Sequence, residues 1–289
     1  MGRRTLLSAC VIGWALVAAC GSDGGPTGPT NSGPGSPEAT ITAPGSGRTY
    51  TAGQRIAFAG SATDAEDGVL PGNALVWTSS RDGQIGSGTT LDYNGLTVGT
   101  HKITLRATDS DSKFGTDTVS VTIEQIPDVP TVPSTLIILK NDIDDENGGV
   151  AEKNVTNLTD WNVTRQCIDL HGPGSTNPLP GNGLYIDMDG SCDQAGRIET
   201  KTTYPLAVGT YKLDLVLAGN NQNFPTDTMT VSVGTVFSQQ VIMQENDPFG
   251  LYTFDFTVST ATSGKIVFDH RGGDQQGILI DAIQLRKSN

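Results

Sequence analysis

The chain has few cysteines, few histidines and few aromatic residues. Its 289 residues include 4 Cys and 3 His, and Phe, Trp and Tyr together make up 6%. The histidines His101, His171 and His270 show no metal-ligand spacing, and no GxSxG nucleophile motif occurs. Glycoside hydrolysis needs two carboxylates across a cleft. Pairs such as Asp187 and Asp189 arise easily in an acidic chain and lack other catalytic signs, so the sequence predicts a protein that is not an enzyme.

Basic residues and helical periodicity are also scarce. Lys and Arg number 18 against 31 Asp and Glu, which gives a formal net charge of -13. Such a surface repels nucleic acid and anionic membranes, so neutral glycans or metal cations are better partners. No long stretch repeats its apolar residues every 3.6 positions, whereas 36 Gly and short runs of Thr, Ser, Val and Asp suit many short strands and turns. The composition predicts an all-β fold.

The longest apolar run lies at the start of the chain and is too short to span a membrane. It extends from Leu6 to Ala19, after two arginines, and falls short of the ~20 residues that a spanning helix needs. The segment that ends it, VAAC, resembles the bacterial lipobox. That resemblance implies a signal peptide over residues 1–19, a lipid on Cys20, and attachment to the outer membrane, since Gly21 and not Asp follows. An ordinary secretory signal with a chance Cys is the alternative.

Composition divides the rest of the chain. Residues 20–37 are so rich in Gly, Pro and Ser that they predict a disordered tether. Residues 125–134 contain three closely spaced prolines and predict a stiff, extended linker. The predicted domains are therefore residues 38–124 and residues 135–289.

The first domain shows short alternating strands separated by turns rich in Gly and Asp. The pattern predicts an antiparallel β-sandwich without a cysteine pair, with Trp77 at the centre of its core. Residues 38–124, with the segments AEDG and GTHKITLRATDS, resemble the immunoglobulin-like and PKD-like repeats of bacterial surface proteins. The resemblance implies a spacer or adhesive unit. Four acidic residues in its turns could either bind calcium or cap the turns: Asp64, Glu66, Asp67 and Asp109.

The second domain contains about eight predicted strands, enough for a jelly-roll sandwich. Leu213, Leu215 and Leu217 alternate on one face of one strand, and similar patterns recur up to Leu285. Segments such as PGNGLYIDMDGS, VGTYKLDLVLAGN and GILIDAIQL resemble the galactose-binding-like jelly rolls of bacterial surface proteins and plant cell-wall proteins. The resemblance covers about residues 136–286 and implies a non-catalytic module that associates with carbohydrate or cell wall.

The stretch from Leu184 to Asp189 alternates apolar and polar residues, which is typical of a half-buried strand. Its polar face, next to two loops, is the predicted ligand site. Tyr185 would stack on a sugar ring, or else would lie at the edge of the core. The whole predicted ligand set is Asn182, Tyr185, Asp187, Asp189, Asn220 and Arg271. Jelly rolls bind either on a concave sheet face or at loop tips, and the sequence does not choose between them.

A structural calcium ion is predicted in the second domain. Asp281 lies in ILIDAIQL, where apolar residues on both sides predict burial, and a buried carboxylate needs a partner. The residues from Asn141 to Asn147 are dense in oxygen ligands, as calcium requires. The resemblance to galactose-binding-like folds implies calcium between this loop and the last strand, with ligands Asp142, Asp144, Glu146 and Asp281. Hydrogen bonds to backbone or an Arg are the alternative for Asp281.

Cys167 and Cys192 are the only cysteines of the predicted mature chain besides Cys20, so outside the cytoplasm they are expected to pair. Two free buried thiols are the alternative. Taken together, the sequence predicts a lipid-anchored cell-surface protein whose second domain binds polysaccharide and whose first domain is a spacer. It would contact the membrane only through the lipid on Cys20. The other hypothesis is a structural or adhesive protein with a protein partner, which the scarcity of aromatic residues favours.

Overall fold

The computed structural model describes residues 35–173, 175, 183–192, 195–220, 226–272 and 275–288. In these residues the regular structure is β-strand, apart from three short 3-10 turns, and no α-helix occurs. The all-β prediction is confirmed. None of the described helical turns is long and apolar enough to cross a membrane. The predicted signal peptide, Cys20 and most of the predicted tether lie outside the described residues.

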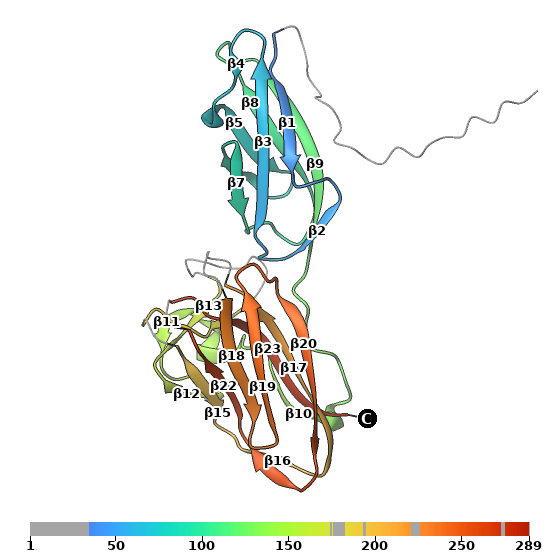
Figure 1. Ribbon diagram of the computed structural model, residues 1–289, viewed down its shortest axis with the longest axis vertical. Helices are drawn as coiled ribbons and strands as arrows, with labels where there is room; N and C mark the ends of the chain where they lie inside the picture. The colour runs from blue at the N-terminus through green and yellow to red at the C-terminus, as the bar shows by residue number, and fades with distance from the viewer. Residues whose placement is uncertain are drawn as a thin grey trace, which may run out of the picture.

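The chain up to Glu124 forms one β-sandwich of two sheets. One sheet has the order β2-β9-β8-β5-β6, and the other has β1-β3-β4 with β7 also paired to β3. Figure 1 shows this sandwich above the second one. Its elements are β1 (Glu38–Ala43), β2 (Arg48–Thr51), β3 (Ile56–Asp64), β4 (Gly68–Val69), η1 (Gly72–Ala74), β5 (Leu75–Ser79), β6 (Gly83–Ser87), β7 (Thr90–Tyr93), β8 (Gly99–Thr108) and β9 (Phe114–Glu124).

Alternation of side chains builds the core of the first sandwich. Along β8, Ile103, Leu105 and Ala107 are fully buried while the residues between them are more exposed, as expected for a strand with one face on a core. Trp77 is 0% exposed, packs its ring 5.5 Å from that of Phe58, and donates its Nε1–H to the carbonyl of Gly88 at 2.9 Å. The predicted core position of Trp77 is confirmed.

The chain from Ile137 forms a second sandwich. The larger sheet has the order β11-β13-β14-β23-β17-β20 with β10 on β23, the facing sheet has β12-β15-β22-β18-β19, and β16 pairs with β21. Its elements are η2 (Ser134–Leu136), β10 (Ile137–Asn141), η3 (Glu146–Gly149), β11 (Glu152–Val155), β12 (Trp161–Arg165), β13 (Ile168–His171), β14 (Tyr185–Asp187), β15 (Arg197–Thr200), β16 (Tyr204–Leu206), β17 (Gly209–Ala218), β18 (Thr226–Val233), β19 (Phe237–Gln244), β20 (Gly250–Val258), β21 (Thr262–Gly264), β22 (Ile266–His270) and β23 (Leu279–Lys287).

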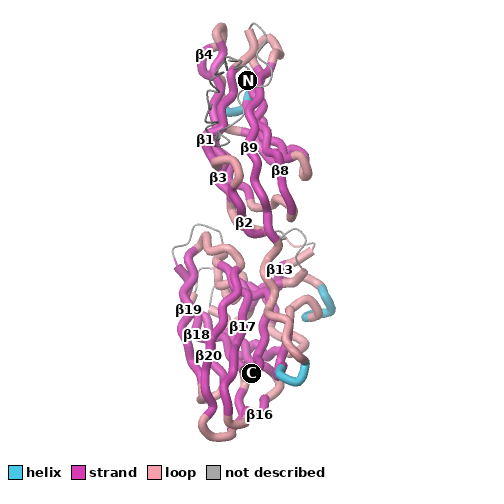
Figure 2. Tube along the Cα trace, turned by 90° about the vertical axis from the view of Figure 1, so that its right-hand side faces the viewer, coloured by secondary structure: helices cyan, strands magenta, loops and turns pink. Residues whose placement is uncertain are grey.

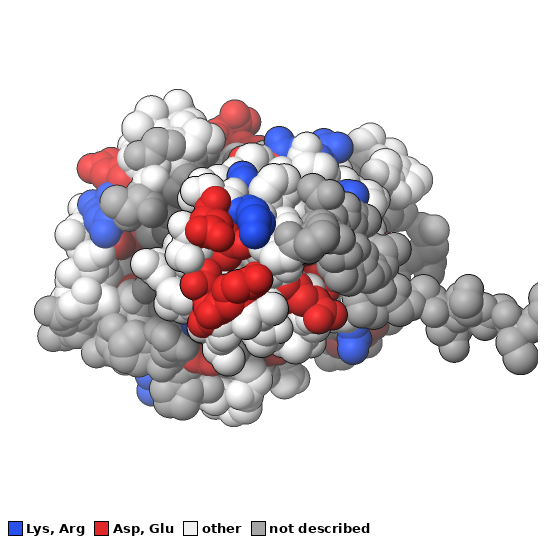
Figure 3. Space-filling view, turned by 90° about the horizontal axis from the view of Figure 1, so that it is seen from above, with Lys and Arg blue, Asp and Glu red and all other residues white. Residues whose placement is uncertain are grey.

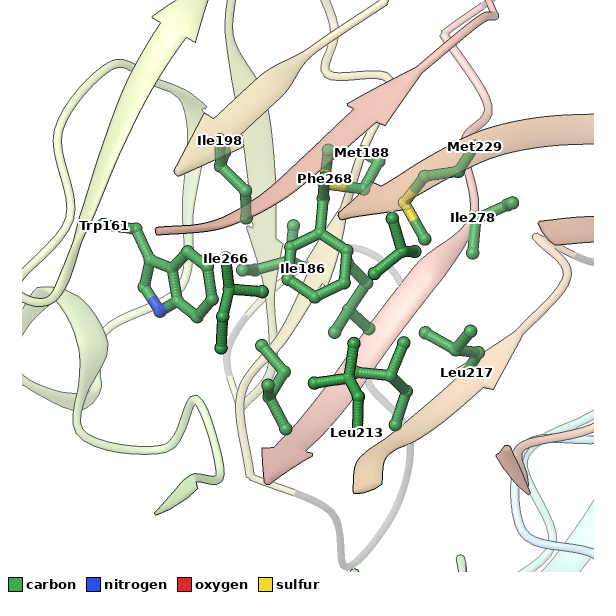
Figure 4. Close-up of a cluster of buried hydrophobic side chains, with 14 of the residues drawn as sticks. Trp161, Ile186, Met188, Ile198, Leu213, Leu217, Met229, Ile266, Phe268 and Ile278 are labelled. Atoms are coloured by element: carbon green, nitrogen blue, oxygen red, sulfur yellow. The ribbon is translucent and has the colours of Figure 1, made fainter. Parts of the chain in front are cut away.

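The two sheets of the second sandwich enclose one apolar core. Leu213 and Leu217 of β17 point at Met229 and Phe268 of the facing sheet, and Trp161 closes the core on one side (Figure 4). The rings of Trp161 and Phe268 are 5.5 Å apart. The alternation of leucines in β17 therefore has the predicted inward direction.

The linker between the sandwiches lies against the outer face of the larger sheet. Ile126 and Val129 of the linker are buried, and they share an apolar cluster with Val216 and Ala282, which point outward from β17 and β23. Gln284 donates its Nε2–H to the carbonyl of Pro130 at 3.0 Å. Figure 1 shows the linker descending along the second sandwich, and Figure 2 shows the two sandwiches stacked end to end. The linker therefore fixes the sandwiches to each other as well as spacing them.

Candidate functional site

β14 is an internal strand of the larger sheet at the end that faces the first sandwich. It pairs with β13 on one side and β23 on the other, with Asp187 opposite Asp169 and Tyr185 opposite His171. Both faces of this strand are buried, so the prediction of a half-buried strand with an open polar face is wrong. The apolar side chains face the core, and the polar ones are covered by loops and by the first sandwich, which the local pattern does not encode.

The carboxylate of Asp187 is the centre of a buried polar cluster. Its Oδ1 accepts the backbone N–H of Gly277 at 2.8 Å and of Asp189 at 3.0 Å, and its Oδ2 accepts Nδ2–H of Asn220 at 2.7 Å. Nε2 of His171 lies 3.8 Å from the same Oδ2. Burial raises the pKa of the Asp187 carboxyl, and the nearby His171 ring and the hydrogen bond from the Asp189 N–H oppose that rise. We call these five residues the Asp187 cluster.

A second buried histidine lies next to the Asp187 cluster. His270 ends β22 and is 0% exposed. Its Nδ1 lies 3.0 Å from the backbone N of Gly272, and its Nε2 lies 3.4 Å from the backbone N of Ile278 and 3.5 Å from Oδ1 of Asp227. Gly272 has no room for a Cβ, which would lie 2.6 Å from Oδ2 of Asp189. The loop therefore packs directly on these buried groups.

Tyr185 is 1% exposed and does not present an open stacking face. Its ring stacks on that of His171 at 5.5 Å and meets the ring of Phe249 edge-on at 5.9 Å. Burial, followed by the negative charges of Asp187 and Asp281, raises the pKa of the Tyr185 phenol well above its ordinary value. Of the two alternatives for Tyr185, the structure favours the core-edge position.

A small, partly open crevice lies where the two sandwiches meet, with about 30 Å³ of space that water can enter. The first sandwich contributes Gln54 and Arg55 from the turn between β2 and β3, and Asn94 after β7. The second sandwich contributes Tyr185, Asn220, Asn246 and Phe249. The lining thus combines aromatic rings and carboxamides with two charged residues, Arg55 and Asp247, and with small or apolar residues. A carboxamide both donates and accepts hydrogen bonds, which suits a ligand with hydroxyl groups.

Charged groups at the crevice already have partners. Nη2 of Arg55 is 2.5 Å from Oδ2 of Asp92. Oδ2 of Asp247 accepts the N–H of Gln244 at 2.8 Å and so closes its own turn. Asn220 uses its Nδ2 hydrogens on Asp187 and on the carbonyl of Gly277. Its Oδ1 is therefore the atom with which Asn220 can accept a hydrogen bond from a ligand.

The predicted ligand residues are only partly brought together. Tyr185, Asp187, Asp189 and Asn220 lie within or beside the Asp187 cluster, although all four are buried. Arg271 follows β22 and is exposed. Asn182 lies outside the described residues.

The predicted calcium ligands of the second sandwich have other contacts. Glu146 is 1% exposed, and its carboxylate accepts the N–H groups of Thr159 at 2.5 Å and Asp160 at 3.2 Å. Oδ1 of Asp144 accepts the N–H of Leu184 at 2.7 Å. Asp142 is exposed.

Asp281 is only half-buried. It lies at a bulge where β17 pairs with Ile280 and then Ala282, so the prediction of burial from its apolar neighbours is wrong. Among the described residues, no group of three or more His, Cys, Asp or Glu is placed to hold a metal ion. Calcium binding stays a prediction.

The acidic residues of the first sandwich gather at its far tip. Figure 3, viewed from above, shows acidic side chains clustered on this face. Oδ1 of Asp64 accepts the N–H groups of Glu66 at 2.9 Å and Asp67 at 3.1 Å, which lower the pKa of the Asp64 carboxyl. Asp67 accepts both the N–H and the hydroxyl of Ser110. These contacts support the turn-capping alternative.

Cys167 and Cys192 form a disulfide, as predicted. The bond joins the start of β13 to the loop that follows β14. Beside it, Ser191 donates its hydroxyl to Oδ2 of Asp169 at 2.5 Å. The bridge therefore holds one of the loops that cover the Asp187 cluster.

Sequence reasoning missed Gln54, Asn94 and Asn246. Each lies in a turn at a strand end, Gln54 and Asn94 beside a Gly and Asn246 two residues before a Pro, and such turns are where ligand contacts concentrate. The local signal was present. What it lacked was any indication that turns about 190 residues apart in the sequence meet in one crevice.

No protein-family model and no curated protein matches the chain. Among solved structures, a study of carbohydrate-binding modules from the β-sandwich superfamily aligns at 13% identity, covering 86% of this chain and 98% of that one, with a TM-score of 0.28. A carbohydrate-binding module of Cellvibrio mixtus lichenase 5A with cellotriose aligns at 11% identity over 53% and 100%, with a TM-score of 0.32. A ruminal endo-β-1,4-mannanase aligns at 11% over 55% and 27%, with a TM-score of 0.30. These values are too low to carry an argument about function.

Proposed function

We propose that this chain is a non-catalytic, lipid-anchored surface protein whose second sandwich binds a neutral carbohydrate. The lipid on Cys20 would attach it to the outer membrane, and the first sandwich would hold the binding end away from the bilayer. The observation that carries the proposal is the crevice lining. Aromatic rings and carboxamides line it, and its charged groups already have partners.

A neutral, hydroxyl-bearing ligand fits this lining better than an ion does. Hydroxyl groups donate and accept at once, and the carboxamides of Asn220 and Asn246 meet both needs. Tyr185 and Phe249 form the floor of the crevice but are only 1% and 5% exposed, so the apolar area that they offer to the C–H groups of a sugar is small. The net charge of -13 disfavours an anionic glycan.

The covered face of the larger sheet also supports a site at this end. Val216 and Ala282 point outward from that sheet, yet the linker buries them. A ligand could reach this sheet face only by displacing the linker. Of the two places where jelly rolls bind, the loop end is therefore the better candidate.

The test is a glycan array with an insoluble-polysaccharide pull-down. It uses the mature chain with Cys20→Ser, in calcium and in chelator. Asn246→Ala is the informative variant, because Asn246 is exposed and its loss leaves the core intact. Gln239→Ala is the matched control, a carboxamide on an exposed part of β19 outside the crevice. Retention that Asn246→Ala weakens and Gln239→Ala does not would support the proposal, and absence of any retained glycan would refute it.

A second candidate is a structural or adhesive protein that binds another protein. The burial of Tyr185 and Phe249 favours it, since carbohydrate sites usually display aromatic faces. Failure to retain any glycan, together with capture of one defined protein partner that Asn246→Ala releases, would establish this alternative.

A further inference from the structure

We propose that the carbohydrate site is composite: one neutral oligosaccharide contacts both sandwiches, and Gln54 and Asn94 of the first sandwich bind it directly. The inference rests on the proposed carbohydrate binding. It gives the first sandwich a role in recognition beyond that of a spacer.

The wall formed by the first sandwich is a tight and well-defined turn. The N–H of Gln54 donates to the carbonyl of Thr51 at 3.0 Å, and Oε1 of Gln54 accepts the N–H of Thr51 at 3.1 Å. Gly53 adopts a φ of 81°, in the left-handed region that glycine tolerates best. Because the side-chain carbonyl of Gln54 is occupied, its amide NH₂ is the group that offers hydrogen bonds to a ligand.

The two walls offer complementary groups. Gln54 presents a donor, whereas Asn220 has used its Nδ2 hydrogens on Asp187 and Gly277 and presents its Oδ1 as an acceptor. Asn94 on one wall can do both. Nδ2 of Asn246 on the other wall already donates one hydrogen to Oε1 of Glu245 at 2.7 Å. A sugar hydroxyl between the walls would accept from one sandwich and donate to the other.

The walls are held in place before any ligand arrives. Tyr185 and Phe249 of the second sandwich belong to the apolar cluster of the first. The linker adds Val129 to that cluster and the Gln284–Pro130 hydrogen bond to the junction. Binding across the crevice therefore does not have to order two freely moving domains, and that ordering is one of the costs that weaken association.

The experiment measures affinity for the neutral oligosaccharide that the mature chain, with Cys20→Ser, retains most strongly in the array. Gln54→Ala and Asn94→Ala each remove one hydrogen bond to a neutral ligand, and we expect each to weaken affinity about threefold to tenfold. The double variant should multiply the two losses. Asn73→Ala is the matched control, because Asn73 is an exposed carboxamide at the far tip of the same sandwich. The control should bind like the unmodified chain.

Each outcome has a defined meaning. If Asn246→Ala weakens binding while Gln54→Ala and Asn94→Ala do not, the composite site is refuted and carbohydrate binding by the second sandwich stands. If the unmodified chain retains no glycan, both proposals fail. A variant could also lose binding because it misfolds, so a second measurement uses the unmodified chain. Its backbone hydrogen exchange should slow in the turn at residues 51–55 when oligosaccharide is added. Unchanged exchange in that turn would also refute the composite site.

Discussion

Removing the disulfide should destabilise the second sandwich by an amount that the chain length between its cysteines sets. Cys167 and Cys192 are 25 residues apart in the sequence. The loop-entropy relation for a cross-link of this span gives about 3.5 kcal/mol at 25 °C. In the variant with Cys167→Ser and Cys192→Ser, the unfolded chain regains the conformational entropy that the cross-link removes. The buried residues around β13 and β14 keep most of their contacts in the folded state.

The assay is urea unfolding of the variant and of the unmodified chain, followed by the fluorescence of Trp161, with the mature chain carrying Cys20→Ser in both. We expect the free energy of unfolding of the second sandwich to fall by about 3.5 kcal/mol and its melting temperature by roughly 7 to 14 °C for a domain of this size. A loss below about 1 kcal/mol would refute the entropic reasoning.

Three further predictions concern buried groups of the second sandwich. Arg286→Met should destabilise the chain by about 3 to 5 kcal/mol, as measured by chemical denaturation, because it leaves a buried carboxylate without its counter-ion. That carboxylate belongs to Asp214, which is fully buried and whose Oδ2 lies 2.6 Å from Nε of Arg286. The double variant with Asp214→Leu should regain the lost stability. Because the pKa of Asp187 is raised in the folded state, its contribution to stability is complete below the ordinary carboxyl pKa and is lost as pH rises through the folded-state pKa. Between pH 4 and pH 8 the free energy of unfolding should therefore fall less in Asp187→Asn than in the unmodified chain. Parallel curves of unfolding free energy against pH would contradict this. Phe249→Ala removes a ring that packs on Tyr185 and should lower the free energy of unfolding by about 3 to 5 kcal/mol. In calorimetry the two sandwiches of this variant should melt in separate transitions. A single transition like that of the unmodified chain would contradict the contact between the sandwiches at Phe249.

The core strands of both sandwiches could be predicted because their information is local. In β17 the alternation of Leu213, Leu215 and Leu217 indicates which face is buried, and this holds for any sheet that packs opposite the strand. The pairing of Cys167 with Cys192 followed from elimination, since the predicted mature chain offers no other candidate once Cys20 carries lipid. Trp77 was predicted to be central because a large apolar ring in a strand of a small sandwich is buried most favourably in the core between the sheets.

The candidate site could be predicted only in part. The sequence pointed to Tyr185, Asp187, Asp189 and Asn220, and the structure places them together at one end of the second sandwich. It did not predict that they are buried, because their cover comes from loops and from another domain. For Asp281 the sequence predicted burial, because its neighbours are apolar, but the structure shows a half-buried residue. The cause is a β-bulge that depends on how β23 pairs with β17.

The all-β class, the inward faces of the strands and the cysteine pair can be predicted from the sequence, because periodicity and composition act within a few residues. That the linker covers the outer face of the larger sheet, and that Gln54 and Asn94 share a crevice with Asn220 and Asn246, becomes visible in the folded chain alone. Those contacts join segments far apart along the chain. Their geometry follows from how two finished sandwiches pack against each other, which no local pattern of residues records.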